Sequence, residues 1–227
     1  MTKRKNVDDV TSNIPGSDGQ SRKYGMSTLA VHAGARPDPV TGARGTPIYQ
    51  TTSFVFDDAE HGAELFNLQT FGYVYSRMTN PTVSVFEERV AQLEGGRGAV
   101  ATSSGHAAQF IAAATLMEAG DEFIASRNLY GGSVTQFGVS FPKLGWKCNF
   151  VDPTDPENFE KAMNDKVKFI FCEGVANPGG IILDLEKIAE IANKHGVLLI
   201  VDNTLASPYL LRPFELSLIH ISEPTRQ

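Results

Sequence analysis

Short apolar runs alternate with helix-like segments from Pro81 onward, and this alternation is the feature that most limits the fold. The runs predict buried strands at residues 99–101, 123–125, 148–151, 167–172 and 197–201. Buried strands joined through helices form a parallel sheet that is covered by helices on both faces. The sequence therefore predicts an α/β domain whose ligands bind beyond the carboxyl ends of the strands.

Helix start and stop signals support this pattern. Asp184 is suited to cap a helix N-terminus, whereas Gly95, Pro142 and Gly196 are suited to end helices. Together with apolar residues at helical spacing, these signals predict helices over residues 83–93, 106–117, 134–141, 156–163 and 185–194.

The first 80 residues have a different character. Residues 1–25 are polar and rich in Ser, Gly, Pro and Asn, so we expect a disordered tail. Residues 26–80 contain prolines and glycines that exclude a long helix, yet they also contain many aromatic side chains. We expect an extended N-terminal arm that buries these aromatics against another surface, such as a neighbouring subunit.

Small residues follow the first predicted strand and form a candidate phosphate site. Ser104, Gly105 and His106 stand where the chain would turn from strand 99–101 into a helix. Small residues let backbone N–H groups approach an anion, and a helix N-terminus adds its positive end. A tight strand-to-helix turn explains the same residues without a ligand.

Polar side chains also follow the other strands. Asp202 ends the most apolar strand, where a carboxylate faces a cation such as a pyridinium nitrogen or caps a local turn. Asn177 could hydrogen-bond a ring oxygen, and Tyr130 could stack on a planar ring. Each residue alone is more often a turn residue or a core aromatic. The guanidinium group of Arg77 is suited to bind a phosphate through two hydrogen bonds, although single arginines are usually solvated.

Composition excludes several classes of function. The net charge of −6 and the pI near 5.4 lack the basic excess that nucleic-acid binding requires. No apolar run reaches the ~20 residues that span a bilayer. Cys148 and Cys172 cannot build a disulfide framework, which fits a cytoplasmic protein. The histidines show no metal-ligand spacing, and we expect no metal site.

Two motif matches fail on their context. The run Gly96-x-Gly98-x-x-Ala101 resembles a dinucleotide fingerprint, but it follows a helix and precedes a strand, the reverse of the required order. Ser104, His106 and Asp202 lack a nucleophile elbow, so a hydrolytic triad is disfavoured.

Taken together, the motifs resemble the Cys/Met metabolism family of pyridoxal-phosphate enzymes of fold type I, over roughly Ser27–Glu215. The resemblance lies in the stretches 46–54, 75–82, 103–108, 129–132, 177–178 and 201–204. Within the family, residues 137–144 and 208–215 are most similar to O-acetylhomoserine sulfhydrylase. The resemblance implies a parallel sheet flanked by helices, pyridoxal 5′-phosphate as cofactor, and a homo-oligomer, with a homotetramer as the expected form.

The resemblance also implies roles for individual residues. Gly105 and His106 would offer backbone amides to the cofactor phosphate, although the family often has Met where His106 stands. Tyr75 and Arg77 would reach the phosphate of a neighbouring subunit. The remaining cofactor-binding positions would be Ser104, Tyr130 stacked on the ring, Asn177 at the ring hydroxyl, Asp202 at the ring nitrogen, and Thr204. Tyr130 and Asp202 would also be catalytic.

The implied reaction is a γ-replacement on O-acetyl-L-homoserine with sulfide or a small thiol, in homocysteine and methionine biosynthesis. The family's Schiff-base lysine should follow Asp202, but the last lysine is Lys194. We therefore expect residues 81–215 to be an incomplete cofactor domain and the chain to be an inactive fragment. Residues 216–227 look like a translated sequencing adapter; a divergent final strand is the alternative.

Other functions stay open at this point. Cystathionine γ-synthase and the γ- or β-lyases use the same cofactor machinery. A protein of another class, a non-catalytic binding or assembly subunit that never had the lysine, would show the same motifs.

Overall fold

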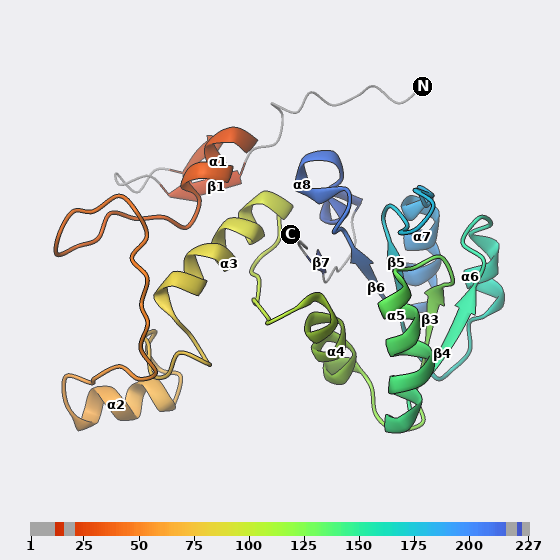
Figure 1. Ribbon diagram of the computed structural model, residues 1–227, viewed down its shortest axis with the longest axis horizontal. Helices are drawn as coiled ribbons and strands as arrows, with labels where there is room; N and C mark the ends of the chain where they lie inside the picture. Colours follow the sequence, from red (N-terminus) through yellow and green to blue (C-terminus); the bar gives the residue numbers. More distant parts are fainter. Residues whose placement is uncertain (1–11, 16–20, 217–221, 224–227) are drawn as a thin grey trace. The chain divides into compact units, whose positions relative to one another are not determined.

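The computed structural model describes residues 12–15, 21–216 and 222–223, and the chain divides into two compact units, residues 1–101 and 102–227 (Figure 1). Residues 217–221 and 224–227, most of the expected adapter-derived tail, lie outside the described residues, as do 1–11 and 16–20 of the expected disordered tail. Both expectations therefore stay predictions.

The first unit contains three helices and one strand pair among its described residues. Strands β1 and β2 pair antiparallel, and helix α1 contacts helix α3 (Figure 1). The bounds of these elements are β1 Ser12–Pro15, β2 Ser21–Tyr24, α1 Met26–His32, α2 Ala59–Phe66 and α3 Pro81–Glu94. Helix α3 thus groups with the residues before it, and its end at Gly95, which has a left-handed φ of 76°, confirms the predicted stop.

The N-terminus of α3 holds the preceding arm in place. Asn80 accepts a hydrogen bond from the Thr82 N–H (2.9 Å) and donates to the Tyr49 carbonyl (3.0 Å) and the Ser76 hydroxyl (2.9 Å). The Thr82 hydroxyl in turn donates to the Pro47 carbonyl (2.8 Å). These bonds attach two distant stretches of the arm to one helix end. Asn80 therefore both caps the helix and holds the arm against it.

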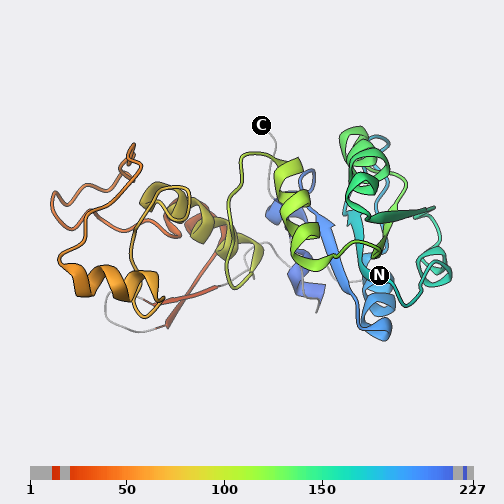
Figure 2. The same ribbon diagram turned by 90° about the horizontal axis from the view of Figure 1, so that it is seen from below.

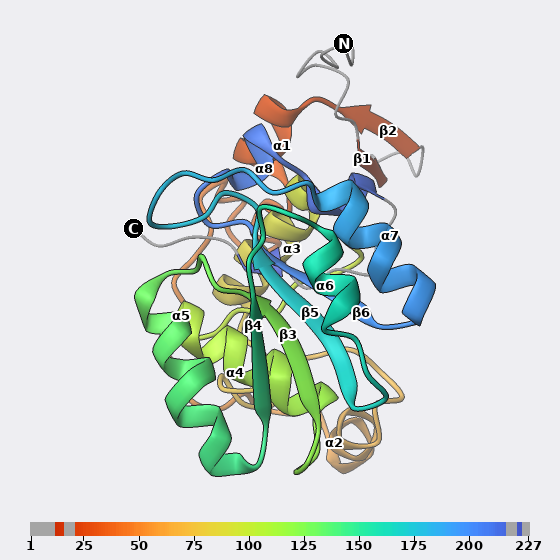
Figure 3. The same ribbon diagram turned by 90° about the vertical axis from the view of Figure 1, so that its right-hand side faces the viewer.

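The second unit is an α/β domain. Its elements are α4 Gly105–Leu116, β3 Glu122–Ser126, α5 Gly131–Thr135, β4 Lys147–Val151, α6 Glu157–Lys161, β5 Val167–Glu173, α7 Leu185–His195, β6 Leu198–Asp202, α8 Ser207–Leu210 and β7 Ser222–Glu223. The strands form one sheet in the order β4-β3-β5-β6-β7, and every pairing in it is parallel. The predicted parallel sheet is confirmed (Figure 3).

Side chains alternate between two hydrophobic cores, one on each face of this sheet. One core gathers Ile124, Ile170 and Val201 with residues of α6 and α7. The other gathers Phe123, Phe169, Phe171 and Ile200 with residues of α4 and of the segment after α5. Neighbouring strand residues point to opposite faces, so strands that are apolar throughout need cover on both sides. Figure 2 shows α5 and α7 on opposite sides of the sheet.

Helix α7 follows its sequence signals. The Asp184 side chain accepts a hydrogen bond from the Lys187 N–H, and Gly196 ends the helix with a left-handed φ of 66°. Both predicted boundaries are confirmed.

Two predictions about local structure are wrong. Residues 99–101 form no strand: Val100 is 82% exposed, and the Ala101 N–H donates to the Glu87 carboxylate (2.7 Å) instead of a neighbouring strand. Pro142 does not end the helix after Tyr130 either. The chain continues through a π-helical turn and a 3-10 helix to Gly145, because proline at the first positions of a new helical turn needs no N–H partner.

Candidate functional site

The carboxyl ends of β3, β5 and β6 bring three chain segments to one edge of the sheet. Strand β5 ends at Glu173 and β6 ends at Asp202, and these two residues are direct neighbours in the parallel register. The loop after β3 leads to Tyr130, and the loop after β5 leads to Asn177. Parallel strands end together, so polar residues that are far apart in sequence converge here.

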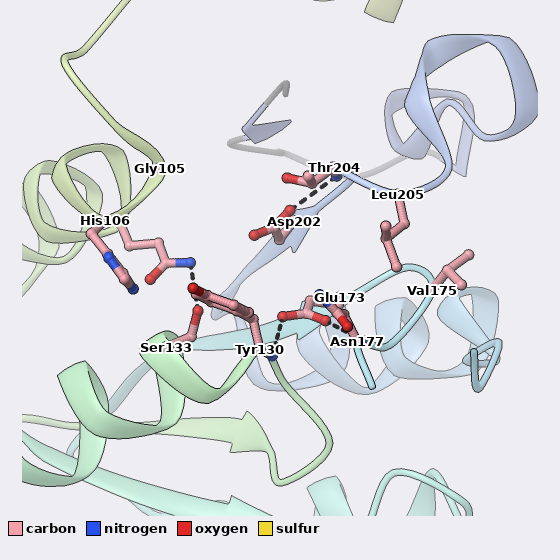
Figure 4. Close-up of a pocket in the computed structure, with 11 residues that line it drawn as sticks. Gly105, His106, Tyr130, Ser133, Glu173, Val175, Asn177, Asp202, Thr204 and Leu205 are labelled. Carbon is pink, nitrogen blue, oxygen red and sulfur yellow. Dashed lines mark hydrogen bonds between the residues drawn. The ribbon is translucent and has the colours of Figure 1, made fainter. Parts of the chain in front are cut away.

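A pocket lies at this edge and is built entirely from the second unit (Figure 4). It is lined by Gly105, His106, Gln109, Tyr130, Ser133, Glu173, Val175, Asn177, Asp202, Thr204 and Leu205.

Glu173 lines the pocket and connects two of its loops. The side chain is 4% exposed. Its Oε1 accepts a hydrogen bond from the Tyr130 N–H (2.7 Å), and its Oε2 accepts one from the Asn177 N–H (2.8 Å). Burial raises the pKa of Glu173; the two N–H bonds oppose that rise, and the Asp202 charge adds to it.

Asp202 presents its carboxylate to the same pocket. Its Oδ1 accepts a hydrogen bond from the Thr204 N–H (3.0 Å), and its backbone carbonyl accepts one from the Gly174 N–H (3.1 Å). The turn after β6 therefore fixes the carboxylate by its own backbone. Glu173 and Asp202 are register neighbours and both line the pocket, so two carboxyl groups face one cavity, an arrangement that favours a cationic partner.

Helix α4 begins at the pocket wall. Ser104 is its N-cap, and the Ser104 hydroxyl accepts a hydrogen bond from the Ala107 N–H (3.2 Å). The N–H groups of Gly105 and His106 precede the first intrahelical bonds and have no acceptor inside the helix. A helix N-terminus of this kind attracts an anion.

His106 and Tyr130 form an aromatic pair above Gly132. Their ring centroids are 5.9 Å apart. A Cβ at Gly132 would lie 2.5 Å from the Tyr130 ring and 2.6 Å from the His106 ring, so any larger residue there would require both rings to shift. The His106 Nε2 is buried and has no hydrogen-bond partner among the described residues. Gln109 donates to the Ser133 hydroxyl (2.9 Å) close by, which joins α4 to α5.

Most of the residues singled out from the sequence meet in this pocket. Six of the nine line it, namely Gly105, His106, Tyr130, Asn177, Asp202 and Thr204, and Ser104 caps the adjoining helix. Tyr75 and Arg77 belong to the first unit, where the Arg77 guanidinium lies 5.5 Å from the centre of the Tyr75 ring.

Sequence reasoning did not assign three of the polar lining residues. They are Glu173, Gln109 and Ser133. A charged residue that ends an apolar strand is a usable signal for Glu173, whereas Gln109 and Ser133 carry none because they lie inside helices. Within the described residues, no group of three or more His, Cys, Asp or Glu side chains could hold a metal ion, and no helix is long and apolar enough to cross a membrane.

Comparison with known proteins bears on this arrangement. The family model described as Cys/Met metabolism PLP-dependent enzyme matches residues 27–222. The chain belongs to this family. The resemblance to this family that the sequence motifs indicated is thereby confirmed. Pyridoxal 5′-phosphate is the cofactor of the Cys/Met metabolism family.

Several of the curated relatives are named as sulfhydrylases, and others are named as homocysteine synthases. An O-acetyl-L-homoserine sulfhydrylase of Leptospira meyeri is 47% identical over 88% of this chain and 46% of its own length. The sulfhydrylase FUB7 of Gibberella moniliformis is 50% identical over 84% of this chain and 44% of its own. The chain thus spans about half the length of these relatives.

A solved structure shares the fold. It is named as an O-acetylhomoserine (thiol)-lyase of Campylobacter jejuni and contains N′-pyridoxyl-lysine-5′-monophosphate. It is 37% identical, has a TM-score of 0.84, and matches 87% of this chain and 49% of its own. The chain therefore has the fold type I architecture that the resemblance to the family implied.

The pocket residues fit the chemistry of this cofactor. A phosphate group matches the N–H groups at the start of α4, and a protonated ring nitrogen matches the Asp202 carboxylate. A planar pyridine ring matches the Tyr130 side chain, and the unpartnered buried Nε2 of His106 offers a further polar contact.

Proposed function

We propose that the complete protein catalyses a γ-replacement on O-acetyl-L-homoserine, with sulfide or a small thiol as the sulfur donor. The observation that carries the proposal is the pocket, which joins a helix N-terminus, an aromatic ring and a strand-end carboxylate at one edge of a parallel sheet. The sulfhydrylase names of the Leptospira and Gibberella relatives support this choice of reaction over the other reactions of the family.

The residues of the pocket would divide the work between them. The N–H groups of Gly105 and His106, with Ser104, would bind the phosphate. Tyr130 would cover one face of the ring, and Asn177 would contact the ring hydroxyl. When bound, the cofactor supplies an electron sink for the substrate's Cα. Asp202 would hold a proton on the ring nitrogen, and the Thr204 N–H bond keeps the Asp202 carboxylate in place.

Tyr75 and Arg77 carry the second part of the proposal. We assign them to the cofactor phosphate of a neighbouring copy of the chain, which makes the protein a homo-oligomer. An arginine whose guanidinium stays close to a tyrosine ring retains its charge and its planar set of donors for a phosphate. A cytoplasmic location likewise stays a prediction.

The 227-residue chain by itself is proposed to be inactive. It contains no lysine after Lys194, and the family's covalent cofactor link requires one after Asp202. If the isolated chain, supplied with pyridoxal 5′-phosphate, turned over O-acetylhomoserine, this part of the proposal would be wrong.

The reaction is tested on the complete protein with a panel of three substrates. O-acetylhomoserine, O-succinylhomoserine and cystathionine are each supplied, the first two with sulfide. Homocysteine and cysteine are both measured, because γ-cleavage of cystathionine releases cysteine and β-cleavage releases homocysteine. We expect turnover of O-acetylhomoserine with the highest kcat/KM. A preference for O-succinylhomoserine or cystathionine would move the assignment to the cystathionine γ-synthase or lyase reactions. No turnover of any of them would favour a non-catalytic binding or assembly subunit.

A further inference from the structure

Glu173 lines the pocket, but none of its atoms is assigned to the cofactor in the proposed function. It ends β5 and is almost fully buried, at 4% exposure. Its two carboxylate oxygens each accept one backbone N–H, at 2.7 Å from Tyr130 and at 2.8 Å from Asn177 (Figure 4). The two donors come from different loops, one after β3 and one after β5.

The chemistry of these bonds requires a carboxylate. Both partners are N–H donors, so both side-chain oxygens must be acceptors. A glutamine at this position would offer one oxygen and one NH₂ group, and the NH₂ group would face a second donor. A buried carboxylate is costly unless it is hydrogen-bonded, and charge-assisted bonds from N–H groups offset that cost.

We infer that Glu173 is a positioning residue of the pocket: its carboxylate fixes the Tyr130 loop and the Asn177 loop relative to each other through one oxygen each. It acts through the backbone of the two residues proposed to contact the cofactor ring, and the link to the cofactor rests on the proposed function. Asp202 is its register neighbour, so the same residue also ties the two loops to the strand pair that carries the ring-nitrogen partner.

The inference is tested on the 227-residue chain labelled with ¹⁵N, by amide hydrogen exchange. Glu173→Gln should speed exchange at the Tyr130 or the Asn177 amide by on the order of tenfold, because one of the two amides loses its acceptor. Glu173→Asp keeps two oxygens on a shorter side chain and should give a smaller change.

Glu122→Gln is the matched control. Glu122 also accepts several hydrogen bonds in the same sheet, but it starts β3 and does not line the pocket. It should leave the Tyr130 and Asn177 amides unchanged. Unchanged exchange at both amides in Glu173→Gln would overturn the inference. Faster exchange spread evenly over β5 and β6 would also overturn it, because Glu173 would then merely hold the sheet together.

A second measurement determines the affinity of the pocket for a cofactor analogue. The probe is 4′-deoxypyridoxine 5′-phosphate, which lacks the aldehyde and cannot react with lysines. Its Kd should rise roughly three- to tenfold in Glu173→Gln, recover partly in Glu173→Asp and stay unchanged in Glu122→Gln. An unchanged Kd in Glu173→Gln would contradict the positioning role. Failure of the unmodified chain to bind the probe would count against the proposed cofactor site, while the amide measurement would still decide the role of Glu173.

Discussion

Glutamate side chains at the two ends of the central sheet have opposite electrostatic surroundings. At the amino end of β3, Glu122 accepts hydrogen bonds from Lys147, Asn149 and Asn164, and Lys147 is its register neighbour. The Asn149 bond, followed by the Lys147 bond, lowers the pKa of Glu122 to about 2. At the carboxyl end, Glu173 has another carboxylate, Asp202, as its register neighbour, and burial raises its pKa.

This difference separates stability from function. An opposite-charge pair across neighbouring strands is stabilising, whereas a like-charge pair is destabilising by a similar amount. The amino end is therefore electrostatically complete without a ligand. The carboxyl end has two carboxyl groups that a cationic ligand would complement. Groups with shifted pKa values are typical of such binding sites.

The largest effect is expected from removing the charge at the carboxyl end. In the complete protein, Asp202→Asn should lower kcat/KM for O-acetylhomoserine by about 100-fold or more, because an amide cannot hold a proton on the ring nitrogen as a carboxylate does. Steady-state kinetics measure the loss. Glu122→Gln in the same protein should keep turnover within about twofold of the unmodified enzyme; a comparable loss there would erase the contrast between the two ends.

The next effect concerns stability and comes from the amino end. Glu122→Gln should lower the free energy of unfolding by about 2 kcal/mol at neutral pH, because the Lys147 and Asn149 bonds lose their charged acceptor. The Glu122 side chain is only 12% exposed, so solvent screens this interaction weakly. Urea unfolding followed by Trp146 fluorescence measures it. An unfolding midpoint equal to that of the unmodified chain would show that the cluster contributes nothing.

The pH dependence of that difference sharpens the comparison further. The pKa of Glu122 falls from 4.5 to about 2 on folding, so the carboxylate stabilises the fold fully above pH 4.5. The stabilisation is lost as the pH falls toward 2. Urea midpoints of the unmodified chain and of Glu122→Gln should therefore converge between about pH 5 and about pH 2. A constant gap over this range would contradict the lowered pKa.

The smallest effect is expected at the helix cap beside the pocket. Ser104→Ala should cost about 1 kcal/mol of unfolding free energy, because the Ala107 N–H loses its acceptor. It should also weaken binding of 4′-deoxypyridoxine 5′-phosphate, whereas Glu122→Gln should not. Ser104→Asn, which keeps a capping oxygen, should restore most of the stability; if it does not, the cap is not the cause.

Local sequence signals predicted α7 well. Asp184 and Gly196 act within one turn of the helix they bound, so no distant residue is needed for them to work. The strand at residues 99–101 failed for the opposite reason. A strand needs a neighbouring backbone, and a run of small apolar residues does not reveal that the Ala101 N–H bonds to a glutamate side chain of α3.

The residues of the candidate site also divide into those that local sequence signals predicted and those that depend on distant parts of the chain. Asp202, Tyr130, Asn177 and the turn at Ser104 and Gly105 could be picked out because each follows an apolar run or opens a helix. Glu173 also ends an apolar run, but its role could not be read from that signal, because the role lies in the hydrogen bonds that it accepts from N–H groups 43 and 4 residues away.

The sequence by itself determined the class of fold, because apolar runs too short for helices, separated by helices, can be buried only in a covered parallel sheet. It also determined the family, through motifs read one at a time. Only the tertiary structure decided which strand ends meet, which carboxylates become neighbours, and which of them is matched by a lysine. Those properties depend on strand order and register, which are set by packing between segments that are distant in the chain.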